Sequence, residues 1–251
     1  LLSHANLIAN AGSTSDVHQL AERDRVMVSL PLYHINALVV ALVTPLFHGG
    51  SLVMVPRFSA STFWADVCRF GCTWINVVPT IIAYLLNDAA GAAGLGLQGI
   101  RFCRSASAAL APEHHRAFEA RFGLGIIETM GLTETAAPAF SNPLDAKQRR
   151  VGSVGRPAGT RAAVIGPDGR PAPTGERGEI VLQGPNVMQG YYKDPERTRE
   201  AFTPDGWLRT GDIGYQDADG FFYITGRSKE LIIKGGENIA PREIDEAVLR
   251  H

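Results

Sequence analysis

The stretch that decides the fold is Ile100–Thr129, with the sequence IRFCRSASAALAPEHHRAFEARFGLGIIET. Its two ends, 100–103 and 126–129, are short and mostly apolar and predict β-strands. Between them, residues 112–122 follow the spacing of an amphipathic helix. A strand, a helix and a second strand in this order predict a parallel pair joined by a crossover helix.

The same alternation extends toward the N-terminus. Further strands are predicted at 25–30, 51–55 and 74–78, and helices at 37–47, 61–70 and 79–87. Residues 1–100 hold only nine charged side chains, against 24 basic and 25 acidic residues in the whole chain. Strands that helices cover on both faces have such an apolar composition. We therefore predict an α/β fold with a mostly parallel sheet and crossover helices.

The composition changes near residue 150, where glycine and proline become frequent and turn signals separate short strands. These strands are predicted at 161–165, 178–183 and 221–225, with a short helix at 195–201. They indicate a small antiparallel β-sheet or barrel. Beyond Gly226 we expect a strand at 230–233, a turn at Gly235–Gly236 and a helix that begins at Pro241.

The overall composition argues against several classes of protein. The formal net charge of −1 disfavours nucleic acid as a partner. The longest apolar stretch, 37–47, is too short to span a membrane, and no signal-peptide pattern opens the chain. Three cysteines (Cys68, Cys72 and Cys103) are too few for a disulfide framework and predict a reducing compartment, the cytoplasm.

The most informative motif, Glu128–Thr135, follows directly on a predicted buried strand. Ligands bind at the carboxyl ends of strands in α/β sheets. Gly131 would let the backbone approach a ligand, Thr133 offers a hydroxyl to a phosphate, and Glu134 offers a hard oxygen to Mg²⁺. Taken alone, the segment also fits an ordinary capped turn.

Two further motifs lie in the C-terminal half. In Gly206–Asp212, a carboxylate behind a glycine can accept hydrogen bonds from two neighbouring ribose hydroxyls, although a lone Thr-Gly-Asp also fits a β-turn. In Gly226–Asn238, Arg227 can contact ribose or phosphate oxygens, and Gly235 and Gly236 leave space for a narrow ligand. That segment also fits a solvated charged hairpin. His114 and His115, on the helix at 112–122, are expected to face solvent rather than to hold a metal.

In this order and spacing, the three motifs resemble those of the adenylate-forming superfamily, which comprises acyl-CoA synthetases, luciferases and the adenylation domains of peptide synthetases. Pro31–His34 is similar to its substrate-gate motif and Ser105–Leu110 to its adenine loop. Residues 175–180 and 190–192 resemble its barrel motif. The resemblance covers the chain from end to end. The family's phosphate loop and its adenylation lysine are not in the chain, so we expect a fragment of a longer protein.

The resemblance implies an ATP-dependent carboxylic acid–CoA ligase that forms an acyl-adenylate and then an acyl-CoA thioester. ATP or AMP, Mg²⁺ and coenzyme A are its implied cofactors. Glu134 would hold Mg²⁺, Thr133 the α-phosphate and Asp212 the ribose diol. Arg227 would contact the ribose or a phosphate, and His34 would orient the carboxylate of the substrate.

The resemblance also implies an adenine slot, a hinge and a channel for CoA. The slot would be lined by Ser107, Ala108, Ala109, Thr129, Met130 and Ile224, with Met130 in the place of a stacked tyrosine. Lys229 would be the hinge residue, and Gly235 and Gly236 would border the channel. The parts implied are an α/β subdomain at 1–150, a small β-rich subdomain at 151–226, and the hinge with the start of a lid domain at 227–251.

The substrate stays open at this point. Residues 58–64, 101–105 and 141–144 resemble oxalate–CoA ligases, but Asn36 and Ala137 stand where those enzymes place histidines. Ala136–Pro138 forms an apolar wall, so we predict a monocarboxylic acid, fatty or aryl, with an oxalate or dicarboxylate ligase as the alternative. A non-catalytic nucleotide- or acyl-binding module is the alternative of another class. An adenylation domain that loads a carrier-protein thiol ranks third.

Overall fold

The computed structural model describes residues 1–88, 91–228, 232–234 and 237–239. Its larger sheet has seven strands in the order β2-β1-β3-β4-β5-β6-β7. These strands are β1 (Arg25–Val28), β2 (Ser51–Met54), β3 (Trp74–Val77), β4 (Phe102–Ser105), β5 (Ile126–Leu132), β6 (Ala137–Ser141) and β7 (Arg156–Pro157). The neighbours from β2 to β5 are parallel, and β6 and β7 are added antiparallel. The predicted mostly parallel sheet is confirmed.

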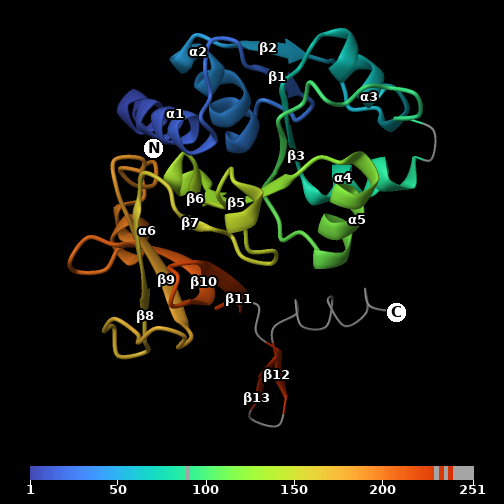
Figure 1. The fold of residues 1–251 in the computed structure, drawn as a ribbon. Coiled ribbons are helices and arrows are strands. Elements are labelled where there is room, and N and C mark those ends of the chain that lie inside the picture. Colours follow the sequence, from blue (N-terminus) through green and yellow to red (C-terminus); the bar gives the residue numbers. More distant parts are fainter. Residues whose placement is uncertain (89–90, 229–231, 235–236, 240–251) are drawn as a thin grey trace.

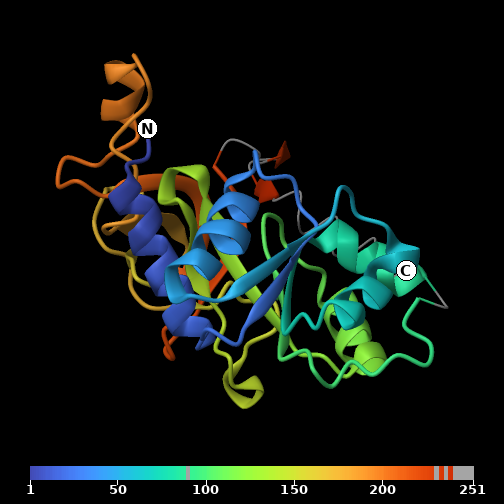
Figure 2. The same cartoon turned by 90° about the horizontal axis from the view of Figure 1, so that it is seen from above.

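Helices cover both faces of this sheet, as Figure 2 shows from above. They are α1 (His4–His18), η1 (Asn36–Val43), α2 (Thr44–His48), α3 (Ala60–Arg69), α4 (Pro79–Asn87) and α5 (Pro112–Phe122). Successive strand residues point to opposite faces. Met27 and Ile75 therefore pack in one core with α3, α4 and α5, while Val26 and Trp74 pack in a second core with η1.

The single helix predicted at 37–47 is two helical segments. The first, η1, is a π-helix, and α2 continues it from Thr44. The backbone N–H and the hydroxyl of Thr44 both donate to the carbonyl of Val39, five residues earlier. Pro45, the next residue, has no N–H to offer. Asn36 is the first residue of η1 and is buried.

The smaller sheet is antiparallel, as predicted, with the order β11-β10-β9-β8. Its strands are β8 (Arg161–Ile165), β9 (Gly178–Gln183), β10 (Leu208–Gln216) and β11 (Phe222–Arg227). Strand β10, which the sequence did not predict, is irregular in its pairing with both neighbours near Ile213. Helix α6 (Pro195–Glu200) precedes it, and the short strands β12 (Ile232–Lys234) and β13 (Glu237–Ile239) pair antiparallel.

The two sheets lie next to each other (Figure 1), and a third apolar core joins them. Phe140 of β6 and Phe222 of β11 are completely buried, and their ring centroids lie 4.9 Å apart. Met130 of β5 and Ile180 of β9 belong to the same cluster. The smaller sheet is thereby held against the ends of β5 and β6.

Several predicted features lie outside the described residues. They are Lys229, the turn at Gly235–Gly236 and the helix from Pro241. Within the described part of the chain, no helix combines the length and the apolar character needed to cross a membrane.

We expect Phe222→Ala to lower the free energy of unfolding by about 3–5 kcal/mol, because it removes a ring from a filled core and leaves a cavity. Urea denaturation of the purified protein measures this loss. Tyr192→Ala, at a residue that is 69% exposed, is the control and should change stability by less than about 0.5 kcal/mol. Equal losses in the two variants would contradict the role of the junction core.

Candidate active site

Two adjoining pockets lie where the carboxyl ends of the parallel strands meet the smaller sheet. Their volumes are about 630 Å³ and about 550 Å³. Four residues line both pockets: Ser107, Gly131, Leu132 and Arg227. Because ligands of α/β proteins bind at this edge of the sheet, the two pockets form one continuous candidate site.

The smaller pocket brings together the residues predicted for adenine and ribose. Its lining includes Ser107, Ala108, Ala109, Thr129, Met130, Asp212, Ile224 and Arg227. The loop 107–109 is exposed, and Ser107 has a positive φ of 75°. Glu128 and Gly152, which the sequence analysis did not assign, also line it.

Asp212 and Arg227 form an ion pair across β10 and β11. The two residues face each other in register, and the Nε of Arg227 donates to Oδ1 of Asp212 over 2.9 Å. The Asp212 side chain is 7% exposed and that of Arg227 is 50% exposed. Gly211 has a positive φ of 71° directly before Asp212. The left-handed backbone at Gly211 and the ion pair together fix the carboxylate at the rim of the smaller pocket.

Glu134 is held by a residue to which the sequence gave no role. It lies in η2 (Thr133–Thr135), and its Oε1 accepts a hydrogen bond of 2.8 Å from the hydroxyl of Tyr191. The backbone N–H of Met188 donates to the Glu134 carbonyl. Burial and the neighbouring Glu134 carboxylate raise the pKa of Tyr191, which therefore keeps its proton as a donor. A carboxylate oxygen oriented in this way fits the hard-ligand preference of Mg²⁺.

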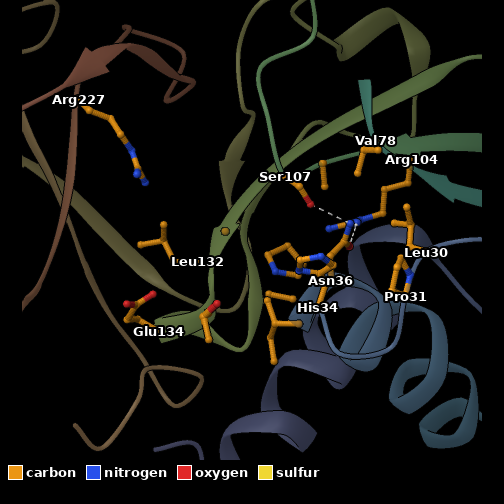
Figure 3. A pocket seen from close by; sticks show the side chains of 16 residues that line it. Leu30, Pro31, His34, Asn36, Val78, Arg104, Ser107, Leu132, Glu134 and Arg227 are labelled. Atoms are coloured by element: carbon orange, nitrogen blue, oxygen red, sulfur yellow. Dashed lines mark hydrogen bonds between the residues drawn. The ribbon is translucent and has the colours of Figure 1, made fainter. Parts of the chain in front are cut away.

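The larger pocket connects Glu134 to a different set of polar residues. Thr133 and Glu134 line it together with His34, which is exposed at its mouth. Figure 3 shows Arg227 and Glu134 on one side, Arg104 on the opposite side, and His34 and Asn36 between them.

Arg104 and Asn76 are residues that sequence reasoning missed as part of the site. Both are 1% exposed, and Nη1 of Arg104 donates to the side-chain oxygens of Asn36 and Asn76, each over 2.7 Å. The predicted strand ended at Cys103, one residue before Arg104, whereas the observed strand β4 continues to Ser105 and includes this arginine.

Gly131 has a different neighbour from the one the sequence analysis expected. A Cβ atom at this position would lie 2.0 Å from the carbonyl oxygen of Ala137. Ala136 and Ala137 both have positive φ values, 54° and 91°. The absence of a side chain at Gly131 therefore lets β6 approach β5, in addition to opening the wall of both pockets.

The expectation that His115 faces solvent is wrong. Its Nδ1 lies 3.0 Å from Oε1 of Glu128, and its Nε2 lies 3.2 Å from Oε1 of Glu119. On α5 it shares the buried face with Phe118 and Phe122, three and seven residues later. Burial disfavours the charged ring, but the hydrogen bonds and charges of Glu119 and Glu128 outweigh it and raise the pKa of His115 to about 9.

Comparison with known protein families gives a match over most of the chain. The family described as AMP-binding enzyme matches residues 1–192. Sulfoacetate–CoA ligase of Cupriavidus necator is 72% identical over 251 residues, which are 100% of this chain and 49% of that protein. Oxalate–CoA ligase of Arabidopsis thaliana is 38% identical over 100% of this chain and 49% of its own length. The chain spans about half the length of the curated relatives it matches.

Solved structures agree with this match. The crystal structure of ATP-bound MatB from Rhodopseudomonas palustris superposes with a TM-score of 0.90 at 36% identity, over 97% of this chain and 48% of that chain. O-succinylbenzoate coenzyme A synthetase from Bacillus subtilis, in complex with ATP and magnesium ion, gives a TM-score of 0.90 at 31% identity, over 100% of this chain and 51% of that one.

The His115 cluster makes stability depend on pH in one direction. The folded-state pKa of about 9 lies above the value of 6.5 for the free side chain. Protonated His115 therefore stabilises the folded state fully below about pH 6.5, and this stabilisation is lost as the pH rises through about 9. We expect the free energy of unfolding of the wild type to exceed that of His115→Gln at low pH, and this difference to shrink by about 2–3 kcal/mol across this window.

Urea denaturation of both proteins at several pH values between 6 and 10 measures this difference. The comparison cancels other groups that titrate in the same range. A wild-type advantage that stays constant with pH would contradict a protonated His115.

Proposed function

The chain belongs to the family of AMP-binding enzymes, and from that premise we propose that the whole protein is an ATP-dependent carboxylic acid–CoA ligase. The acid would attack the α-phosphorus of ATP, giving an acyl-adenylate and pyrophosphate. The CoA thiol would then displace AMP and give the thioester. The observation that carries this proposal is that the pocket lined by Asp212 adjoins the pocket lined by His34, Thr133 and Glu134, and that Arg227 lines both.

In this proposal the smaller pocket binds the nucleoside. The adenine ring would lie between the loop 107–109 and Met130, with Ile224 closing the slot and the Met130 thioether as a soft contact. The Asp212 carboxylate, already oriented by Arg227, would accept hydrogen bonds from the ribose hydroxyls.

The larger pocket would bring the acid to the phosphate. Thr133 would donate to an oxygen of the α-phosphate, Arg227 would contact ribose or phosphate from its place on both pockets, and His34 would orient the attacking carboxylate. Mg²⁺, held by Glu134, would neutralise phosphate charge when bound. These residues act mainly by positioning two anions for an in-line displacement, which is where most of the catalysis of phosphoryl chemistry comes from.

The second half-reaction involves residues outside the described part of the chain. Lys229 as the hinge residue, Gly235 and Gly236 as the border of the CoA channel, and a lid domain that begins at 227 stay predictions. A location in the cytoplasm stays a prediction as well.

Two substrate classes remain in competition. The apolar wall of Ala136–Pro138 favours a fatty or aryl monocarboxylic acid. The similarity to sulfoacetate–CoA ligase at 72% identity and to oxalate–CoA ligases favours an acid with a second anionic group. Sulfoacetate is therefore the first acid to assay, beside oxalate, malonate, benzoate, hexanoate and palmitate.

A pyrophosphate-release assay on the full-length protein, with ATP, Mg²⁺ and each acid, with and without CoA, tests the activity. Release that depends on one acid supports the ligase, and a requirement for CoA in turnover excludes a carrier-protein thiol. ATP binding without release for any acid would favour a non-catalytic nucleotide-binding module.

We expect Glu134→Gln to lower the rate of adenylate formation by about 100-fold or more, because it removes a charge from the phosphate site. Tyr191→Phe should lower it by about tenfold, since it removes one hydrogen bond to a charged group. Tyr192→Phe, at the neighbouring exposed ring, is the matched control and should keep the wild-type rate. Equal rates in the two tyrosine variants would contradict the orienting role of Tyr191.

A further inference from the structure

The larger pocket contains a buried positive charge that has no acidic partner in the described part of the chain. Arg104 lies in the third position of β4 and is 1% exposed. None of the ion pairs among the described residues includes it. Burying an unpaired charge costs several kcal/mol, so such a cation needs a compensating group.

Two amides orient this guanidinium without neutralising it. Nη1 donates to Oδ1 of Asn36 and to Oδ1 of Asn76, which uses both of its N–H bonds. The amide nitrogens point elsewhere, since Nδ2 of Asn76 donates to Asn36 and Nδ2 of Asn36 donates to Ser107. The amide oxygens are neutral dipoles, so the cation keeps its full charge.

The opposite edge of the guanidinium has a donor without a partner among the described residues, and Arg104 lines the larger pocket. The buried Nε of Arg104 has no hydrogen-bond partner within the described residues. Nε–H and the adjacent Nη2–H together form the planar fork that binds two oxygens of one anion. A carboxylate or a sulfonate presents two such oxygens.

The His18 side chain, whose pKa responds to Arg104, does not compensate this charge. Burial, together with the positive charge of Arg104, lowers the pKa of His18 to about 3, which leaves its ring neutral at pH 7. Burial also lowers the pKa of Arg104 to about 9, so the guanidinium is still protonated at pH 7.

The position of Arg104 in the larger pocket indicates that it would contact the end of the acid remote from the reacting carboxylate. In Figure 3 it lies across the larger pocket from Glu134 and Arg227, beside Leu30 and Val78. If the carboxylate that reacts with ATP lies near His34 and Thr133, the remainder of the acid extends toward Arg104.

We propose that Arg104, oriented by Asn36 and Asn76, binds a second anionic group of the acid, a sulfonate or a carboxylate, and so restricts this enzyme to short acids that are charged at both ends. The inference rests on the proposed ligase function and adds its substrate class. It replaces the preference for a monocarboxylic acid. That preference rested on the apolar wall at Ala136–Pro138 and on the absence of histidines at Asn36 and Ala137, and it did not consider Arg104. A methyl terminus placed beside Arg104 would leave the buried charge uncompensated.

The test compares pairs of acids that differ only in the charge of the far end. Sulfoacetate is paired with methylsulfonylacetate, and malonate with its monoamide, malonamate. In the full-length wild type, kcat/KM for pyrophosphate release should be at least about 100-fold higher for the charged member of at least one pair. The pair with the larger ratio identifies sulfonate or carboxylate as the preferred group.

In Arg104→Gln the preference should fall to less than about tenfold, mainly through a higher KM for the charged acid, while the ATP affinity measured by calorimetry stays unchanged. Asn76→Asp is the second variant, because it places a carboxylate 2.7 Å from Nη1 and compensates the charge without removing the arginine. It should lose the same preference. Arg101→Gln, at an arginine paired with Asp24 and outside both pockets, is the control and should keep it.

The outcomes separate this inference from the proposed function. If the wild type releases pyrophosphate with hexanoate or palmitate at a higher kcat/KM than with either charged acid, the inference is overturned and the ligase function stands. The same holds if Arg104→Gln keeps the wild-type preference. If no acid supports release, the ligase function fails. Calorimetry of sulfoacetate and malonate with the wild type and with Arg104→Gln then decides the inference. Equal affinity of the two proteins for these acids, or no binding to the wild type, overturns it.

Discussion

Phe140 and Phe222 pack against each other at the junction of the two sheets, and the geometry of the site depends on this contact. The larger sheet supplies the loop after β4, the end of β5 and Glu134, while the smaller sheet supplies Asp212 and Arg227. Neither sheet alone supplies the complete lining of either pocket. The buried rings at the junction hold the paired Asp212 and Arg227 over the ends of the parallel strands.

The alternation of strands and helices was predictable because it follows from local patterns of apolar residues. The strands at 161–165 and 178–183 were predicted with their observed bounds. The strands β6 and β10 were not, because Ala137–Ser141 contains a proline and Leu208–Gln216 contains two glycines, which local propensity associates with turns. Their pairing with β5, β9 and β11 stabilises them, and such long-range pairing cannot be derived from a local window.

The prediction of the candidate site was limited in the same way, because contacts between residues far apart in the sequence cannot be derived from a local window. The residues predicted for adenine and ribose, which line the smaller pocket, were identified as a set because they belong to short motifs with a fixed order. Tyr191 was missed because it meets Glu134 from 57 positions away in the sequence. Arg104 was missed because its significance depends on what surrounds it. An arginine on a solvated edge is ordinary, and only the burial of β4 reveals a charge that no acidic side chain of the described residues compensates.

The contact between Gly131 and the carbonyl of Ala137 limits how this chain can evolve. Every amino acid other than glycine carries a Cβ, so each missense change in the codon for Gly131 introduces an atom where the backbone of β6 already lies. Met130, one position earlier, can exchange its flexible side chain for another of similar volume. Adjacent codons in the same strand therefore experience opposite selection. Drift can change the side chain that lines the smaller pocket at position 130, and it is blocked at position 131.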